Sequence, residues 1–209
     1  MVVETANPML EEYLAATGGR LCRGSLFESG GWEEAPGDFR TRYELRDHLR
    51  KQYGFAIPNE QALDLLVSLS PIIEIGAGTG YWAYLLQQRG ADVLAYDRKP
   101  PREGKNWYGM AREWVAVEKA NAKQALVGGH ADRTLFLCWP PYDDPMADTA
   151  LRLYQGDGVV YVGEDEGGCN ATGTFFRRLE RWGDLVRTVD LPQWPGIHDD
   201  LFYWRRKGA

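Results

Sequence analysis

A glycine-rich turn within residues 72–97 constrains the fold of this chain more than any other feature. The segment IIEIGAGTGYW places three alternating glycines directly after a short apolar run, and the next apolar run, ADVLAYD, ends at Asp97. A β-rich run closed by glycine and followed by a helical pattern is typical of a buried parallel strand. The two runs therefore predict neighbouring strands joined by a crossover helix, with the glycine turn at the carboxyl edge of the sheet.

Strand and helix patterns alternate along most of the chain. Helices are expected at residues 39–51, 59–70 with Asn59 as N-cap, 81–90, 121–130, 145–155 between an Asp144 cap and Gly156, and 172–183. Strands are expected at 71–76, 91–97, 133–142, 159–164, 184–191 and 200–206, while 114–120 fits either a third strand or the start of a helix. The alternation up to residue 183 predicts a parallel sheet with right-handed crossovers. The last two strands have no helix between them and are expected to be antiparallel neighbours.

The composition predicts one well-packed core and excludes several classes of protein. With 209 residues and 44% hydrophobic content, the chain forms roughly one to one and a half domains. Its apolar runs are shorter than the roughly 20 residues of a membrane span, and its acidic N-terminus does not have the order of a signal peptide, so a cytoplasmic location without membrane association is expected. The net charge of −6 argues against a nucleic-acid partner. Cys22, Cys138 and Cys169 are scattered, which predicts buried reduced thiols and no metal site.

The spacing of the glycines indicates which type of cofactor this turn can bind. A dinucleotide turn, G-x-G-x-x-G, needs a third glycine where this chain has Tyr81. A phosphate loop needs a Gly-Lys-Ser/Thr sequence, and residues 72–98 contain no lysine. Both phosphate-binding alternatives therefore fit poorly.

The segment EIGAGTGY, Asp97 and the final strand pair resemble those of class I S-adenosylmethionine-dependent methyltransferases, whose first motif is E/D-x-G-x-G-x-G. The resemblance covers about residues 55–207 and implies a doubly wound α/β fold with a mostly parallel seven-stranded sheet. Its last strand would be antiparallel and inserted beside the fifth. It also implies S-adenosylmethionine as the cofactor, held by Tyr53, Glu74, Gly76, Ala77, Gly78, Gly80, Tyr81, Asp97, Asn121 and Trp139.

The resemblance also implies roles for these residues. The glycines let the backbone turn tightly beneath a ligand without a Cβ in the way. Glu74 would orient the loop or reach the methionine ammonium, and Asp97 would accept hydrogen bonds from both ribose hydroxyls. Asn121 would replace the usual acid near the adenine. The structural alternatives are a plain strand–helix turn and, for Asp97, a strand-end cap.

The methyl acceptor is expected beyond the next two strand ends. CWPPYDDP resembles the fourth motif of amino-methyltransferases, with Trp139 in place of the usual Asn or Asp and with Pro140 and Tyr142 beside the acceptor. Glu164 and His198 lie in loops at the same rim, and we predict Glu164, His198 and Tyr142 as catalytic and acceptor-binding residues. The alternatives are a proline-terminated strand with core aromatics, a solvated acidic loop and a histidine without function.

We divide the chain into an N-terminal helical lid or substrate-recognition segment, 1–58, and a Rossmann-like core, 59–209. The predicted function is methyl transfer to a nitrogen or oxygen of a small-molecule acceptor. A nucleic-acid or protein methyltransferase and a non-catalytic cofactor-binding partner subunit are the alternatives. The identity of the acceptor, the atom methylated and the oligomeric state, a homo-oligomer included, lie beyond the sequence.

Overall fold

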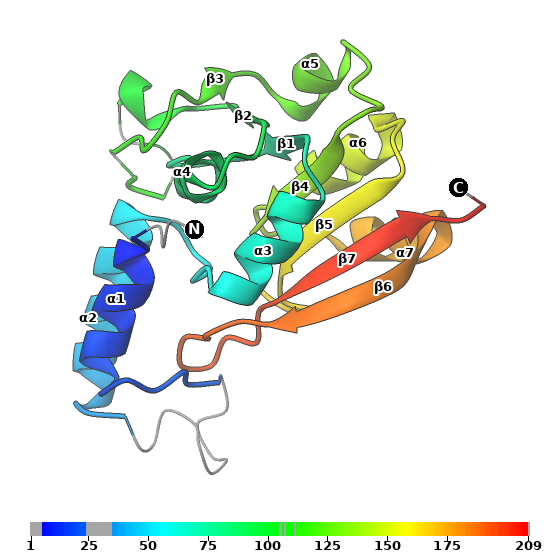
Figure 1. Ribbon diagram of the computed structural model, residues 1–209. Coiled ribbons are helices and arrows are strands. Elements are labelled where there is room, and N and C mark those ends of the chain that lie inside the picture. Colours follow the sequence, from blue (N-terminus) through cyan, green and yellow to red (C-terminus); the bar gives the residue numbers. More distant parts are fainter. Residues whose placement is uncertain (1–5, 24–34, 105, 107, 111, 209) are drawn as a thin grey trace.

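A computed structural model of the chain describes residues 6–23, 35–104, 106, 108–110 and 112–208 (Figure 1). Its helices are α1 Pro8–Ala16, α2 Phe39–Gln52, α3 Glu60–Ser68, α4 Tyr81–Gln88, α5 Ala122–Leu126, α6 Met146–Leu153 and α7 Gly173–Trp182, with a short 3-10 helix, η2, at Pro101–Glu103. Its strands are β1 Ile72–Ile75, β2 Val93–Asp97, β3 Glu118–Lys119, β4 Thr134–Cys138, β5 Gly158–Gly163, β6 Gly183–Asp190 and β7 Asp200–Arg206.

The seven strands form one sheet in the order β3-β2-β1-β4-β5-β7-β6. Strands β1 to β5 pair in parallel, and β7 pairs antiparallel with both β5 and β6. The predicted insertion of an antiparallel last strand beside the fifth is therefore confirmed. Residues 114–120, which fitted two alternatives, contain the two-residue edge strand β3.

Both faces of the central strands β1, β4 and β5 are buried, which explains why these strands are almost entirely apolar. Alternate residues such as Ile72 and Phe136 belong to a core with α1, α3 and α4, whereas Ile73 and Leu135 belong to a core with α5, α6 and α7. Figure 1 shows α3 on one face and α6 and α7 on the other.

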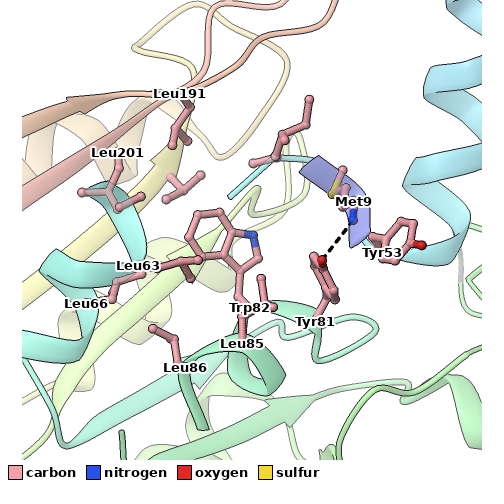
Figure 2. Packing of buried hydrophobic residues seen from close by; sticks show 14 of the residues in the cluster. Met9, Tyr53, Leu63, Leu66, Tyr81, Trp82, Leu85, Leu86, Leu191 and Leu201 are labelled. Atoms are coloured by element: carbon pink, nitrogen blue, oxygen red, sulfur yellow. Dashed lines mark hydrogen bonds between the residues drawn. The ribbon is translucent and has the colours of Figure 1, made fainter. Parts of the chain in front are cut away.

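The N-terminal segment contributes to the same core. Met9 and Tyr13 of α1 are fully buried, and the Tyr13 ring packs edge-on against Trp194 at 5.5 Å between centroids. Figure 2 shows Tyr81 of α4 pointing toward Met9, whose backbone N–H donates to the Tyr81 hydroxyl at 3.1 Å. Helix α1 is thus anchored to the helix that follows the glycine turn.

Two local predictions need correction. The predicted 145–155 helix spans only Met146–Leu153 because Tyr154 adopts an extended backbone and its buried hydroxyl bonds the Gly158 carbonyl at 2.9 Å. Pro145 lies just before the helix, although Asp144 accepts from Met146 N at 2.9 Å as a cap would. All three cysteines are free, but Cys169 is exposed, so the expectation of buried thiols is wrong there.

Candidate active site

A cavity of about 780 Å³ opens where β1, β2 and β4 end. The glycine turn forms its floor, and Asp97 lies beside it at the end of β2. The start of α5 and the loop after β4 form further walls. The carboxyl ends of adjacent parallel strands are the usual ligand site of an open α/β sheet. The cavity therefore lies where the sequence predicted it.

The glycine turn is held in a conformation that other residues adopt only with strain. Gly76, Gly78 and Gly80 have φ values of +80°, +56° and +71°. A Cβ on Gly80 would lie 2.9 Å from methyl groups of both Val115 and Val117, and one on Gly76 would lie 2.8 Å from Met146 Cε. Glycine is thus required by the backbone and by close packing of the chain's own side chains, in addition to the predicted space for a ligand.

Asp97 fastens the turn to the end of β2. Its Oδ2 accepts a hydrogen bond from Gly78 N at 2.9 Å, and its Oδ1 accepts one from Lys99 N at 2.7 Å. The structural alternative, a strand-end cap, is therefore part of its role. Each carboxylate oxygen retains a second lone pair, so the side chain can still accept from ligand hydroxyls in the cavity.

Glu74 is a buried carboxyl group that borders the cavity. Burial, followed by the negative charge of Asp97, raises the pKa of Glu74 to about 8. Its Oε2 has no hydrogen-bond partner among the described residues. An unpartnered buried carboxyl oxygen calls for a donor or a cation. The unpartnered oxygen of Glu74 therefore suits a hydrogen-bond donor or a cationic group of a ligand on the floor of the cavity.

Of the remaining predicted cofactor residues, Gly80 does not line the cavity; the others do, but several are already engaged. The Asn121 side chain caps α5 by accepting from Gln124 N at 3.0 Å. The Tyr81 hydroxyl is committed to Asn7 and Met9, and the Tyr53 hydroxyl donates to Glu12. Ala77 lies on the floor, and its N–H bonds the Tyr96 carbonyl at 3.0 Å. Tyr53 and Tyr81 thus present ring surface to the cavity and direct their hydroxyls to the N-terminal segment.

Trp139 forms a flat wall where an amino-methyltransferase motif would have a polar acceptor. Its ring is nearly parallel to Phe55, at 5.2 Å between centroids and 13° between planes. Its indole N–H donates to Asp199 Oδ2 at 2.8 Å, and its φ of +48° is unusual for a residue other than glycine. Burial, partly offset by this hydrogen bond, raises the pKa of Asp199 to about 7.

The structure does not bring Glu164, His198 or Pro140 to the cavity lining. The buried Glu164 carboxylate accepts from His198 N at 3.0 Å and from Cys169 N at 2.8 Å, so it ties together the loops after β5 and before β7. The His198 side chain is exposed, and Pro140 is buried. Tyr142 does lie at the rim, with 71% of its surface exposed.

Other residues of the site were missed from the sequence: Asp199, which holds the cavity wall Trp139, and several residues of the cavity lining. Asp199 gave no signal beyond its place in the run GIHDD, because its burial depends on contact with Trp139 across the fold. The segment before β3 also lines the cavity, and its weak periodicity hid this contribution. The missed lining residues of this segment and of α6 are Asn106, Tyr108, Met110, Met146 and Thr149.

No protein-family model matches the chain, and a comparison with curated proteins finds no match. The solved structures that are similar include a 1,6-didemethyltoxoflavin-N1-methyltransferase of Burkholderia thailandensis, with 18% identity over 70% of this chain and 77% of that one and a TM-score of 0.47. The magnesium protoporphyrin IX methyltransferase of Synechocystis PCC 6803 has 12% identity over 99% of this chain and 100% of that one, with a TM-score of 0.45. A tRNA (uracil-54, C5)-methyltransferase of Pyrococcus abyssi has 20% identity over 70% of this chain and 37% of that one, with a TM-score of 0.44.

The sheet order, with antiparallel β7 between β5 and β6, decides the fold class. The fold is that of class I methyltransferases. The distant similarities to solved structures do not by themselves assign an activity or an acceptor to this chain. Two further findings concern the described residues alone: none of their helices is long and apolar enough to cross a membrane, and no cluster of three or more His, Cys, Asp or Glu side chains is arranged to hold a metal ion.

Proposed function

We propose that this chain is an S-adenosylmethionine-dependent methyltransferase that acts on a nitrogen or oxygen of a small molecule. The observation that carries the proposal is the pair of carboxyl groups at the glycine turn. Asp97 is fixed beside Gly78 by a 2.9 Å hydrogen bond, and the buried Glu74 has an unpartnered oxygen. Both residues border one cavity.

The electrostatics of this floor favour a cationic nucleoside over a diphosphate. S-adenosylmethionine carries an ammonium and a sulfonium, and its ribose has two free hydroxyls. Glu74 would receive the ammonium, directly or through water, and Asp97 would accept from the ribose hydroxyls. A dinucleotide would instead bring two negative charges next to the Asp97 carboxylate, which is unfavourable at short range, and its diphosphate would offer Glu74 no ammonium.

The outer part of the cavity supports a small acceptor. Trp139, Phe55 and Tyr142 line it and would limit the orientations open to a bound molecule. The net charge of −6 disfavours a polynucleotide acceptor.

In the proposed mechanism, catalysis depends on alignment. Bound S-adenosylmethionine supplies an electrophilic methyl group on its sulfonium. Asp97 and Glu74 would hold the nucleoside and amino-acid ends, and the Trp139 wall would hold the acceptor with its lone pair toward the methyl group. The new acceptor–carbon bond would replace the carbon–sulfur bond, S-adenosylhomocysteine would leave, and the acceptor would lose its proton to water. Holding two reactants in line in this way is worth several kcal/mol of barrier, at most about 7–11.

One observation favours a second candidate, a non-catalytic cofactor-binding subunit. The predicted bases Glu164 and His198 do not line the cavity. A chain of this kind would bind S-adenosylmethionine but would not catalyse methyl transfer by itself.

The test is release of S-adenosylhomocysteine from S-adenosylmethionine mixed with the protein and a panel of amines, guanidines, phenols and carboxylates. We expect acceptor-dependent release by the wild type and a loss of at least tenfold in Asp97→Asn. Cofactor binding without release from any acceptor would favour the non-catalytic subunit.

A further inference from the structure

A second hollow, of about 340 Å³, adjoins the outer part of the cavity. The two share Phe55 and Tyr108, so a molecule that leans on these rings can reach both. The other residues that line the second hollow come from α2 and are Tyr43, Arg46, Asp47 and Arg50. Nothing in the proposed cofactor site uses this helix.

The boundary between the two spaces is aromatic and flat. Phe55 stacks nearly parallel on Trp139, and Tyr108 meets the Phe55 ring edge-on at 5.1 Å between centroids. Flat aromatic walls recognise planar rings by offset stacking or edge contacts. A planar acceptor would therefore be held better here than a flexible aliphatic one.

The second hollow carries an excess of positive charge on an otherwise acidic molecule. Arg50 bonds Asp47 Oδ1 at 2.7 Å and the Tyr108 carbonyl at 2.6 Å, and Lys51 contacts the same Asp47. Arg46 makes no hydrogen bond or ion pair with any other described residue. Two cations, Arg50 and Lys51, thus share one carboxylate, and the guanidinium of Arg46 is available.

We propose that the methyl acceptor is a planar aromatic molecule that carries an anionic group. Its ring lies against the Trp139 and Phe55 wall, and its anion reaches Arg46 beside Arg50. Guanidinium groups bind carboxylates and phosphates through paired, charge-assisted hydrogen bonds, which suits either anion. This proposal rests on the proposed function, because the ring must lie next to the methyl donor.

The test measures binding of matched ligand pairs to protein saturated with S-adenosylhomocysteine. The pairs are 4-hydroxybenzoate with 4-hydroxybenzamide and anthranilate with 2-aminobenzamide, and phenyl phosphate serves as the phosphate arm. We expect at least one acid to bind about tenfold or more tightly than its amide, a difference of about 1.4 kcal/mol. Comparing the carboxylates with phenyl phosphate shows which anion is preferred.

Variants of α2 test whether Arg46 causes the preference for the acid over its amide. Arg46→Gln should abolish the preference for the acid, and Arg46→Lys should keep part of it. Arg40→Gln is the matched control, because Arg40 lies on the same helix, is exposed and pairs only with Glu44 at 2.9 Å among the described residues. It should leave the preference unchanged.

The outcomes separate this inference from the proposed function. If the protein does not bind S-adenosylhomocysteine, the proposed function itself fails. If it does, the inference is overturned when no acid binds better than its amide. It is also overturned when Arg46→Gln retains the same preference as Arg40→Gln.

Discussion

At the scale of single residues, Glu74 connects the stability of the fold to the chemistry of the site. A carboxyl group kept inside the protein without a full set of partners is unfavourable when charged. The folded protein holds its proton up to about pH 8, whereas an unperturbed glutamate releases it near pH 4.5. Between these values the folded state binds more protons than the unfolded state, so rising pH favours unfolding.

The variant Glu74→Gln removes this ionisation and should stabilise the free protein at high pH. We expect a small difference in unfolding free energy from the wild type below about pH 4.5. As the pH rises, the unfolding free energy of the variant should exceed that of the wild type by an increasing amount, which reaches the order of a few kcal/mol above pH 8. Urea denaturation between pH 5 and 9 measures it. A difference that does not change with pH would show that Glu74 does not titrate in this range.

Asp97 is expected to matter for the cavity more than for the rest of the fold. Asp97→Asn weakens the acceptor for Gly78 N and Lys99 N. We expect a loss of S-adenosylmethionine affinity of tenfold or more and a loss of stability of about 1–2 kcal/mol. Asp92→Asn is the control, since Asp92 pairs with Arg133 at the surface and does not line the cavity. Equal effects of the two variants on affinity would contradict a direct contact with the ligand.

At the scale of elements, α1 and α4 are joined through one hydroxyl. Tyr81 donates to Asn7 Oδ1 at 2.8 Å and accepts from Met9 N at 3.1 Å, both in a buried setting. Figure 2 shows the Tyr81–Met9 bond of this link, and Trp82 of α4 belongs to the same buried cluster as Leu63 of α3. The start of α1 is therefore fixed to the helix that the glycine turn introduces.

Tyr81→Phe should loosen α1 without disturbing the sheet. We expect a loss of about 1–3 kcal/mol, because two buried polar groups lose a partner, and faster amide exchange in α1 than in β1 or β4. Tyr84→Phe is the control, since its hydroxyl makes no hydrogen bond with any described residue. Unchanged exchange in α1 would show that apolar packing alone holds the helix.

The elements that local patterns determine were predicted well from the sequence. Asn59 caps α3 as expected, β1, β2 and β4 lie within their predicted ranges, and β5 begins one residue before its predicted range. Apolar runs and capping side chains act over a few residues, which makes such elements predictable. The glycine turn and Asp97 were also predictable from local sequence patterns, and both border the cavity. The fold followed from the order of these elements.

What the sequence did not reveal depends on contacts between distant segments. Glu164 was expected at the acceptor, but its carboxylate bonds the backbone of His198, 34 residues away, and of Cys169. Trp139 was identified as unusual, but its partner Asp199 is 60 residues further along the chain. No local pattern encodes either pairing.

At the scale of the whole molecule, the segment before residue 59 shares its core with the rest of the chain. Met9, Tyr13, Leu49 and Ile57 are fully buried in one cluster with Leu63 and Trp82. Removing them would expose a large apolar surface on α3 and α4. We therefore expect that folding of the chain requires the segment before residue 59, whether or not this segment also contributes to the choice of acceptor.

A fragment of residues 59–209 should not fold cooperatively. The loss of several buried side chains at about 1.5–3 kcal/mol each exceeds the usual net stability of a domain of this size. Calorimetry of the fragment should show no sharp thermal transition, in contrast to the full chain. A sharp transition would instead support residues 59–209 as an independent domain.

The most direct measurement is isothermal titration calorimetry of the full chain with S-adenosylmethionine and, separately, with NAD. We predict saturable binding of S-adenosylmethionine, no binding of NAD, and loss of binding in Gly78→Val. Residue 78 has a φ of +56°, and its Cβ would lie 3.2 Å from Met110 Sδ. Binding of NAD, or S-adenosylmethionine affinity that is unchanged in a folded Gly78→Val, would contradict a methyl-donor site at this turn.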